Sequence, residues 1–361
     1  MTHILYGAPA SLFSGKARSY LDWKQIDYRE LPPSPEVMQE VIIPAVGYPV
    51  VPIVQKDDGT VIQDTTSIID HFEAEVGGPS VYPDTPVQKL VALLFELYGD
   101  EWLVIPAMHY RWHYNEEWIY GEFGRSRLPD GSDEEQVKIG RETGERFKGF
   151  VPMLGINDAT IPAIEKSYEA LLADLDAHFE AHDYLLGTRP SIGDYGLIGP
   201  LYAHLYRDPE SGKLMKRLAP NVAVWVERMM DAATPLSGDF LEDDAIPETL
   251  LPVLRRIMEE QLPHLQAVAK LYAAWAEANT GAEIPRAIGM APYRVEDVGS
   301  ERFASPFSLW MLQRSLDFYR SLDGTDKVAA DALLDSVGGS AIRNFAPFAR
   351  IHFDNGTMSQ S

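Results

Sequence analysis

Short apolar runs separated by turn signals characterise the beginning of the chain. Residues 4–6 form an apolar run that ends in Gly-Ala-Pro, which predicts a strand followed by a turn. The apolar positions of residues 11–26 then recur at helical spacing, with Phe13, Ala17 and Leu21 among them. This succession of strand and helix is typical of an α/β domain.

A second strand pair is predicted downstream. Residues 50–54 are a β-branched run with an internal proline, and because proline has no N–H to donate, the run starts a strand or lies on an edge or bend. An Asp-Gly turn separates it from the apolar pair 61–62, which completes a hairpin. Asp64 or Thr65 then caps a helix. We therefore predict an α/β domain over residues 1–84.

Helical spacing continues from residue 87 to about residue 235. A long helix is predicted from about 90 to 118, and the polar stretch 121–155 is either a helical insertion or a long loop. The remaining helices expected here are 161–181, one opening at 191 and one around 225–229. We expect residues 87–235 to form an all-helical domain.

The last third of the chain begins with an acidic segment at 238–246, which we interpret as a linker. Amphipathic spacing then resumes, and the helices expected here are 250–276, 306–322 and 326–334. Asn355-Gly356-Thr357 fits a glycosylation sequon, which carries no weight in a cytosolic chain. We therefore predict that residues 236–361 are a helical C-terminal extension.

Charge and composition exclude several functions. The chain has 361 residues, with 31 Lys and Arg against 54 Asp and Glu, so its formal net charge is −23. This field repels phosphate backbones, and we expect no nucleic-acid partner. The absence of cysteine excludes a disulfide framework, a thiolate zinc site and a catalytic cysteine. With no secretory signal and no apolar run long enough for a membrane span, we expect a cytoplasmic protein without a membrane partner.

Three features of the first domain point to a bound ligand. Ser11 and Ser14 stand after a strand at a helix N-terminus, where free N–H groups and the helix dipole stabilise an anion. A cis peptide at Val51-Pro52 would leave the backbone of Val51 free to pair with an extended ligand. Asp64-Thr65 opens a second helix, so this point suits a ligand carboxylate, while Asp64 accepts from a ligand ammonium.

These features occur in a wider pattern that includes a capping box at Ser191-x-x-Asp194. The pattern resembles the glutathione transferase superfamily from residue 4 to about residue 230. The pieces that carry the resemblance are Ser11-x-Phe13-x-x-Lys16-Ala17-Arg18, Val51-Pro52, Gln63-Asp64-Thr65-Thr66-Ser67-Ile68-Ile69, Tyr184-Leu185-Leu186-Gly187-Thr188-Arg189-Pro190-Ser191-Ile192-Gly193-Asp194 and Pro220-Asn221-x-x-x-Trp225. The resemblance implies a thioredoxin-like first domain, an all-α second domain and reduced glutathione bound between them.

The resemblance also implies roles for individual residues. Ser11 matches the serine of the serine-type classes, which donates a hydrogen bond to the glutathione sulfur and so favours its thiolate. Ser14 is the rival hydroxyl at the same helix start. Val51, with Pro52, matches the backbone clamp on the cysteinyl unit. Asp64 and Thr65 match the acidic and hydroxyl pair that holds the γ-glutamyl end.

Three departures from the family pattern limit what carries over. Leu12 follows the serine where members often have proline. The stretch before Val51 is Gly47-Tyr48-Pro49-Val50 where basic residues are frequent, which leaves open how the glycyl carboxylate of glutathione is held. The ordinary pattern has no counterpart for the tail. Without an enzyme cysteine, thiol exchange through a mixed disulfide is excluded, while conjugation, ether cleavage and dehalogenation stay open.

The helix predicted over 90–118 offers further candidates. His109, His113 and Glu117 share one helical face at metal-ligand spacing, yet the surrounding aromatic residues favour packing, and we expect no metal. Candidates for the pocket of the electrophile, with core packing as the alternative, are Trp102, Met108 and Trp112.

Taken together, the sequence predicts a glutathione transferase-like enzyme with a serine-type site, a small hydrophobic electrophile as second substrate and a possible homodimer. The alternative is a non-catalytic member of the fold, in which the extension carries a surface for a protein partner.

Overall fold

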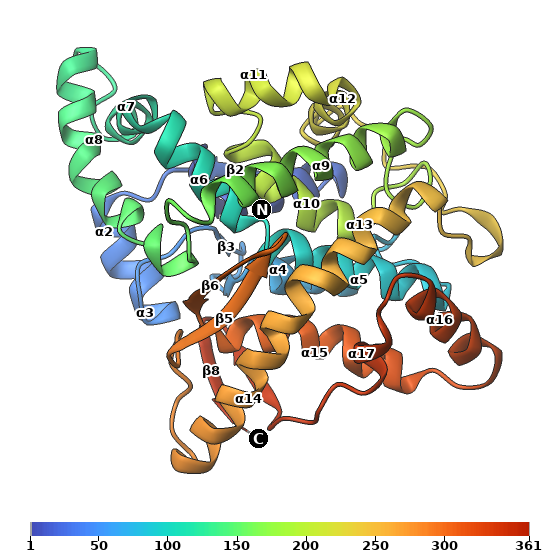
Figure 1. Cartoon of the computed structure of the whole chain (residues 1–361). Coiled ribbons are helices and arrows are strands. Elements are labelled where there is room, and N and C mark those ends of the chain that lie inside the picture. The colour runs from blue at the N-terminus through green and yellow to red at the C-terminus, as the bar shows by residue number, and fades with distance from the viewer. Residues whose placement is uncertain (1, 361) are drawn as a thin grey trace.

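The computed structural model describes residues 2–360, and its first unit is built on a mixed four-stranded sheet (Figure 1). The strands are β1 (His3–Tyr6), β2 (Tyr28–Leu31), β3 (Ile53–Gln55) and β4 (Val61–Gln63). Their order is β2-β1-β3-β4, with β1 parallel to β2 and antiparallel to β3, and with β3 and β4 forming the predicted hairpin. Leu5 lies opposite Val54, and both are fully buried.

Helices flank this sheet. They are α1 (Leu12–Trp23), α2 (Pro35–Val37), which continues through a π-helical turn (Met38–Ile42) into α3 (Ile43–Val46), and α4 (Thr65–Glu75). Helix α4 packs against α1 and buries Ile68, Ile69 and Phe72. A mixed sheet with these helices is the expected thioredoxin-like unit.

A helical domain follows, which confirms the predicted fold class. Its helices are α5 (Pro86–Glu101), α6 (Val104–Tyr114), α7 (Glu116–Arg127), α8 (Asp133–Lys148), α9 (Ile161–Phe179), α10 (Ile192–Ala203), α11 (Pro209–Leu218) and α12 (Pro220–Met229). Helix α10 opens with the predicted capping box, in which Ser191 and Asp194 bond each other reciprocally. It packs between α1 and α5 and so joins the two domains.

The single helix expected over 90–118 is wrong, because the chain breaks it twice. Pro106 cannot donate to the carbonyl of Trp102, and the N–H of Ile105 bonds that carbonyl instead in a tighter turn. At the second break, the side chain of Asn115 donates to Tyr110 O and accepts from the N–H of Glu210. The result is three helices, α5, α6 and α7, with changes of direction between them.

The stretch 121–155 is a helical insertion in which α7 and α8 pack against each other as a hairpin (Figure 1). Glycines allow this close approach. A Cβ built on Gly124 would lie 1.7 Å from the carbonyl oxygen of Gln136, and one on Gly140 would lie 1.7 Å from that of Tyr120. Of the two alternatives that the sequence left open, the long loop is therefore wrong.

The tail folds back on both preceding units and contains strands as well as helices. Its elements are α13 (Leu251–Arg256), a π-helical turn (Ile257–Gln261), α14 (Leu262–Ala278), β5 (Met290–Val295), β6 (Val298–Phe303), α15 (Pro306–Ser321), α16 (Gly324–Ser336), α17 (Ser340–Arg343), β7 (Ile351–Asp354) and β8 (Thr357–Gln360). Besides the helices of the predicted extension, the tail contains two antiparallel hairpins, β5–β6 and β7–β8, which were not predicted.

The tail is attached to the rest of the chain mainly along α5. Helices α15 and α16 both contact α5, and in Figure 1 these orange and red elements occupy the lower part of the molecule. Arg314 of α15 reaches α4, where it donates to Asp70 at 2.6 Å. Within residues 2–360, no helix is long and apolar enough to cross a membrane.

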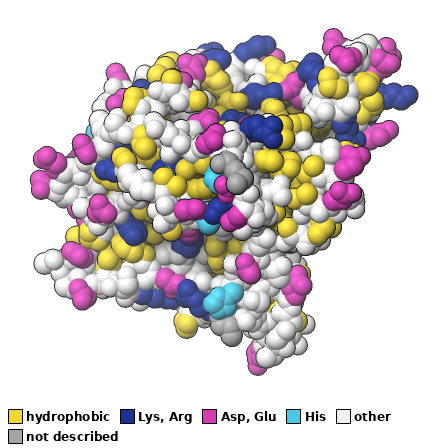
Figure 2. Space-filling view, turned by 180° about the vertical axis from the view of Figure 1, so that it is seen from behind, with side chains coloured by type: hydrophobic (Ala, Val, Ile, Leu, Met, Phe, Trp, Pro, Cys, Tyr) yellow, Lys and Arg dark blue, Asp and Glu magenta, His cyan; other side chains and the backbone are white. Residues whose placement is uncertain are grey.

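Acidic side chains are spread over one face of the molecule. On the face opposite to Figure 1, Asp and Glu are distributed around the whole outline, with Lys and Arg between them (Figure 2). This distribution agrees with the net charge of −23.

Candidate functional site

A cavity of about 330 Å³ lies between the thioredoxin-like unit, α5 and the tail. The thioredoxin-like unit and the residues around α5 supply Phe13, Tyr48, Val50, Val51, Pro52, Gln63, Asp64, Thr65, Asp100, Glu101, Val104 and Leu154. The tail supplies Arg286, Arg302, Phe303, Ser305, Phe307, Phe353, Gly356 and Met358. The structure therefore brings together four predicted ligand contacts, Val51, Pro52, Asp64 and Thr65, in one wall of one cavity.

Val51 and Pro52 lie at the start of β3 and are joined by a cis peptide bond. Among residues 2–360, no group hydrogen bonds to the backbone N–H or C=O of Val51. Because an extended chain offers a complementary N–H and C=O, this edge suits a peptide-like ligand.

Asp64 is held in a sparsely populated backbone conformation between β4 and α4. Its φ is +76°, and its Oδ1 accepts from the N–H of Thr66 at 2.8 Å and of Ser67 at 3.3 Å. Burial raises the pKa of Asp64, while Lys16 and these two N–H groups act in the opposite direction. Such left-handed backbone at a non-glycine residue occurs preferentially at ligand sites.

Thr65 is the first residue of α4, an 11-residue helix whose N-terminus faces the cavity. Asp64 satisfies the N–H groups of Thr66 and Ser67, so the N–H of Thr65 is the helix donor left for a ligand. Beside Asp64, this point can receive a carboxylate and an ammonium that belong to the same molecule.

A buried network of ion pairs lies next to this wall. Lys16 Nζ lies 2.6 Å from Asp100 Oδ2 and 3.1 Å from Glu96 Oε1, and all three side chains are buried. Burial lowers the pKa of Lys16, but the two carboxylates outweigh it and the pKa is raised overall. Asp100 Oδ1 is buried without a partner and borders the cavity, so it offers an additional acceptor to a ligand.

The tail forms the opposite wall, which sequence reasoning missed. Three phenylalanine rings line it, and those of Phe307 and Phe353 meet edge to face with centroids 5.2 Å apart. Two arginines accompany them. Arg286 is exposed and lies over the ring of Tyr48 at 3.5 Å, whereas Arg302 is buried.

Two signals in the sequence mark the elements that carry this wall. In the sequence of residues 290–295, Ala, Tyr and Val occupy every second position, which is the period of a strand, and in the structure these three side chains are buried. Asn355-Gly356, interpreted above only as part of a sequon, is a hairpin turn signal, and both residues have positive φ, 45° and 98°.

Ser11 and Ser14 lie at the start of α1 but outside the lining of the cavity. Ser11 is the N-cap, and its Oγ accepts from the N–H of Ser14 at 3.2 Å, which leaves its O–H free to donate. Ser14 is fully buried, and its Oγ accepts from the N–H of Ala8 at 3.1 Å. The nearest residue of α1 on the cavity is Phe13.

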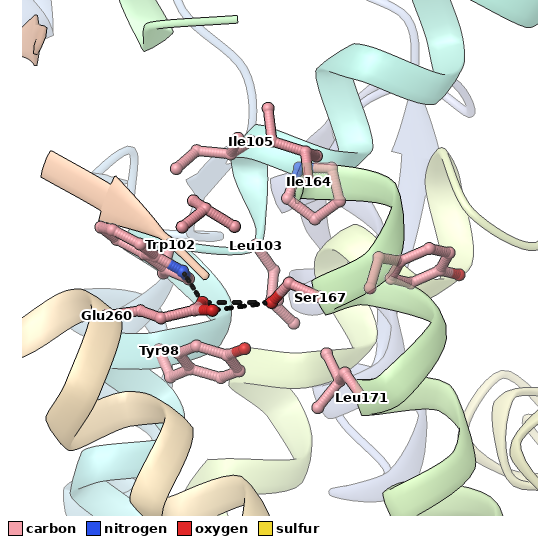
Figure 3. A pocket seen from close by; sticks show the side chains of 11 residues that line it. Tyr98, Trp102, Leu103, Ile105, Ile164, Ser167, Leu171 and Glu260 are labelled. Carbon is pink, nitrogen blue, oxygen red and sulfur yellow. Dashed lines mark hydrogen bonds between the residues drawn. The ribbon is translucent and has the colours of Figure 1, made fainter. Parts of the chain in front are cut away.

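Trp102, Met108 and Trp112 also lie outside the lining of this cavity, which favours core packing, the alternative given for them above. The indole N–H of Trp102 donates to Glu260 Oε2 at 3.3 Å, and Figure 3 shows it pointing with Ser167 toward that carboxylate in a separate space of about 20 Å³. Trp112 is buried against Tyr120. Met108 is half-buried against the core. The break between Glu101 and Val104 places Met108 and Trp112 on a different helix from Asp100 and Glu101, the residues of α5 that line the cavity.

The histidines of α6 are engaged with neighbouring side chains. His109 lies 2.8 Å from Glu165 and 3.2 Å from His113, and Glu117 pairs with Arg141. No group of three or more potential metal ligands is present among residues 2–360.

Two family models match the chain. The model described as glutathione S-transferase, N-terminal domain, matches residues 5–80, and the model described as glutathione S-transferase, C-terminal domain, matches residues 158–228. These two regions of the chain are therefore similar to the N-terminal and C-terminal domains of glutathione S-transferases, in that order. They fall on the thioredoxin-like unit and on α9 to α12, and the tail lies outside both.

Solved structures of the superfamily are similar over about two thirds of the chain. A glutathione S-transferase from Rhodospirillum rubrum F11 has 15% identity, a TM-score of 0.42 and coverage of 68% of this chain and 97% of its own. The beta-etherase LigF from Sphingobium sp. strain SYK-6 has 19% identity, a TM-score of 0.45 and coverage of 65% and 97%. The Tau class transferase MiGSTU from mango has 17% identity, a TM-score of 0.41 and coverage of 69% and 94%. No curated protein matches the chain.

Proposed function

We propose that the chain is a glutathione transferase-like enzyme that binds reduced glutathione on the wall formed by Val51, Pro52, Asp64 and Thr65. The observation that carries this proposal is the convergence of a free Val51 backbone edge and a strained acidic helix cap in one cavity. The Val51 backbone pairs with the cysteinyl unit. The N-terminus of α4 binds the α-carboxylate of the γ-glutamyl unit, and Asp64 with Asp100 accepts from its ammonium.

Thiolate formation is the chemical task of the first domain. A free thiol of pKa ~8.5 is only a few per cent ionised near pH 7, and lowering that pKa by about two units corresponds to roughly 2.7 kcal/mol. Ser11, whose O–H is free to donate, supplies a hydrogen bond that favours the thiolate. Ser14 is the weaker candidate for this hydrogen bond because it is fully buried. Ser305 is a further candidate, since it borders the cavity.

The thiolate then attacks an electrophilic carbon of the second substrate. The thiol proton passes to water before the attack. A carbon–sulfur bond forms, and where a group is displaced, that group leaves with the bonding electron pair. Conjugation and glutathione-dependent cleavage share this step.

The position of Arg286 supports a proposal for how the glycyl carboxylate of glutathione is held. The stretch from Gly47 to Val50 carries no basic residue, but the tail places the guanidinium of Arg286 over the ring of Tyr48 in the same stretch. We assign Arg286 to the glycyl carboxylate, so the tail provides a charge that the first domain lacks. A cytoplasmic location and a homodimer stay predictions.

The test is a pH titration of the thiolate absorbance of glutathione with the protein present, for the wild type, Ser11→Ala and Ser305→Ala. A bound thiol whose pKa lies below the free value, and which returns upward in Ser11→Ala alone, supports the proposal. The same return in Ser305→Ala alone moves the activating role to the tail.

Two further results contradict catalysis. Glutathione that binds with an unshifted thiol pKa would indicate a binding module without activation, and absence of binding would leave the interaction-module alternative. For Arg286→Gln we expect glutathione to bind about tenfold more weakly with the pKa of its bound thiol unchanged, since the carboxylate contact is remote from sulfur.

A further inference from the structure

Arg302 is a buried guanidinium whose hydrogen-bonding capacity is largely unused. Its side chain is 3% exposed, on strand β6. Nη1 and Nη2 share one acceptor, the carbonyl oxygen of Glu101, each at 3.3 Å, and Nε is buried without a partner. Burial lowers its pKa to about 10, although the nearby Glu101 opposes that shift. A desolvated cation in this condition is costly unless something else compensates it.

Another buried arginine of the same chain, Arg111, has a full set of hydrogen-bond acceptors. Arg111 is also 3% exposed, but it forms a two-bond pair with Asp208 at 2.7 and 2.8 Å. It also donates to the carbonyl oxygens of Ala10 and Ala203, each at 2.7 Å. Arg302 forms no such hydrogen-bonded pair with a carboxylate among residues 2–360. The carboxyl of Glu101 accepts from Ser308, and it acts on Arg302 only through its charge.

Arg302 borders the cavity, so a ligand in the cavity could supply the acceptors that the guanidinium lacks. Phe303 and Phe307 border the same space from the same wall. The wall thus combines flat apolar surface with a guanidinium whose Nε has no partner and whose two terminal nitrogens share a single acceptor. A guanidinium fork matches the two oxygens of a carboxylate, and aromatic rings pack against an aromatic body.

We propose that Arg302 is the anchor for an anionic second substrate, an aromatic carboxylate whose ring packs on Phe303 and Phe307. This inference rests on the proposed function, since it places the electrophile opposite the glutathione wall. It also replaces the expectation of a purely apolar electrophile. Asp64 and Asp100, which share Lys16 as a neighbour, lie on the opposite wall with the ammonium of glutathione.

The first test compares two unreactive probes of nearly equal shape on the wild-type protein. Binding of 1-naphthoate and of the neutral 1-naphthamide is measured by calorimetry, with S-methylglutathione present and then absent. We expect naphthoate to bind at least about tenfold more tightly, because a charge-assisted contact is worth more than about 1.4 kcal/mol. Equal affinities would overturn the proposal without any variant.

The second test removes the guanidinium. In Arg302→Met the preference for naphthoate should disappear, and in Arg302→Lys it should fall to an intermediate value because the charge stays and the fork is lost. Methionine keeps the apolar stem, so we expect the variant to fold. Arg294→Met, which removes an exposed arginine of the neighbouring strand β5, should keep the wild-type preference.

Glutathione binding separates the two proposals. Loss of S-methylglutathione binding in Arg302→Met, with naphthoate affinity unchanged, would assign Arg302 to the tripeptide and overturn the inference. If the wild type does not bind S-methylglutathione but still prefers naphthoate through Arg302, the anion site stands and the proposed function fails.

Discussion

The amide oxygen of Asn355 accepts a hydrogen bond of 2.8 Å from the backbone N–H of Gln63, across 292 positions of sequence. Its Nδ2 donates to the carbonyl oxygen of Ala45 at 3.0 Å, so one side chain at the tip of the β7–β8 hairpin bonds two segments of the thioredoxin-like unit. Gln63 and the neighbouring Gly356 both border the cavity. The hairpin tip is therefore held at the rim of the candidate site.

Asn355→Ala should loosen this contact. Two hydrogen bonds are lost and the N–H of Gln63 is left without its partner, so we expect a loss of about 1 to 3 kcal/mol in the free energy of unfolding. Hydrogen exchange at Gln63 and over β7 and β8 should accelerate. Asn344→Ala, at an exposed position with one long contact of 3.5 Å, is the control and should change neither quantity. Unchanged exchange in Asn355→Ala would show that the hairpin is held by its apolar contacts alone.

Lys16→Met should destabilise the fold strongly at neutral pH. Asp100 and Glu96 lose the ammonium that lies 2.6 and 3.1 Å away, and unpaired buried charge costs about 3 to 5 kcal/mol. The folded-state pKa of Lys16 lies above its ordinary 10.5, so the contribution of Lys16 is complete below pH 10.5 and is lost as pH rises above it. Denaturant unfolding at pH 7 and above pH 10.5 measures both effects.

The control for this prediction is Lys213→Met, which removes an exposed lysine that pairs with Glu210 within one helix. It should stay within about 0.5 kcal/mol of the wild type. A loss in Lys16→Met no larger than in the control would mean that the buried carboxylates are protonated in the native state.

Glu101 should make stability depend on pH in a narrow window. Burial raises the pKa of Glu101 to about 7, although Ser308 and Arg302 act against that shift. Unfolding releases its proton between the ordinary value of 4.5 and about 7, so stability is highest below this window and falls as pH rises through it. Glu101→Gln should remove that part of the pH dependence.

Thermal unfolding at a series of pH values between 4.5 and 7 compares Glu101→Gln with the wild type. Glu142→Gln, at an exposed position of α8, serves as the reference and should keep the wild-type profile. Parallel profiles for the wild type and Glu101→Gln would contradict the raised pKa.

Gly140→Ala should disrupt the α7–α8 hairpin. Its new Cβ would lie 1.7 Å from the carbonyl oxygen of Tyr120, and the helices must separate to accept it. We expect a loss of about 3 kcal/mol or more, at or above the upper end of ordinary overpacking. Gly149→Ala, at the end of the same helix with its nearest atom at 3.4 Å, should be nearly neutral. Proteolysis within residues 116–148 measures the loosening, and equal resistance in both variants would contradict the packing argument.

Local patterns predicted the first domain well because its signals are short-range. The Asp-Gly turn, the cap at Asp64 and the cis position at Pro52 each depend on a few neighbouring residues, and all three are present in the structure. The four predicted ligand contacts, Val51, Pro52, Asp64 and Thr65, follow from the same pieces of sequence. The hydroxyl that activates the thiol is different, because Ser11 lies outside the lining of the cavity. Its role stays a prediction.

The second wall could not be predicted in the same way. Arg302 and Phe353 lie on the hairpins β5–β6 and β7–β8 and reach the cavity through the fold of the whole tail. The spacing of residues within the tail does not predict where a hairpin packs. The break between α5 and α6 had a local signal, the proline at position 106. The apolar periodicity continues on both sides of this proline, so the sequence was interpreted as one helix. The orientation of Trp102, Met108 and Trp112 could not be predicted without knowing where this break falls.

Because the cavity has one wall from each end of the chain, a molecule that touches both walls is a thermodynamic link between them. A ligand that binds more tightly when the tail is packed against the cavity than when it is detached must stabilise the packed tail. By linkage, packing of the tail raises the affinity for that ligand by the same factor. Ligand binding and packing of the tail are then coupled, so that a measurement of either one reports on the other. Protection of the Asn355 contact from exchange would report binding as directly as the ligand itself.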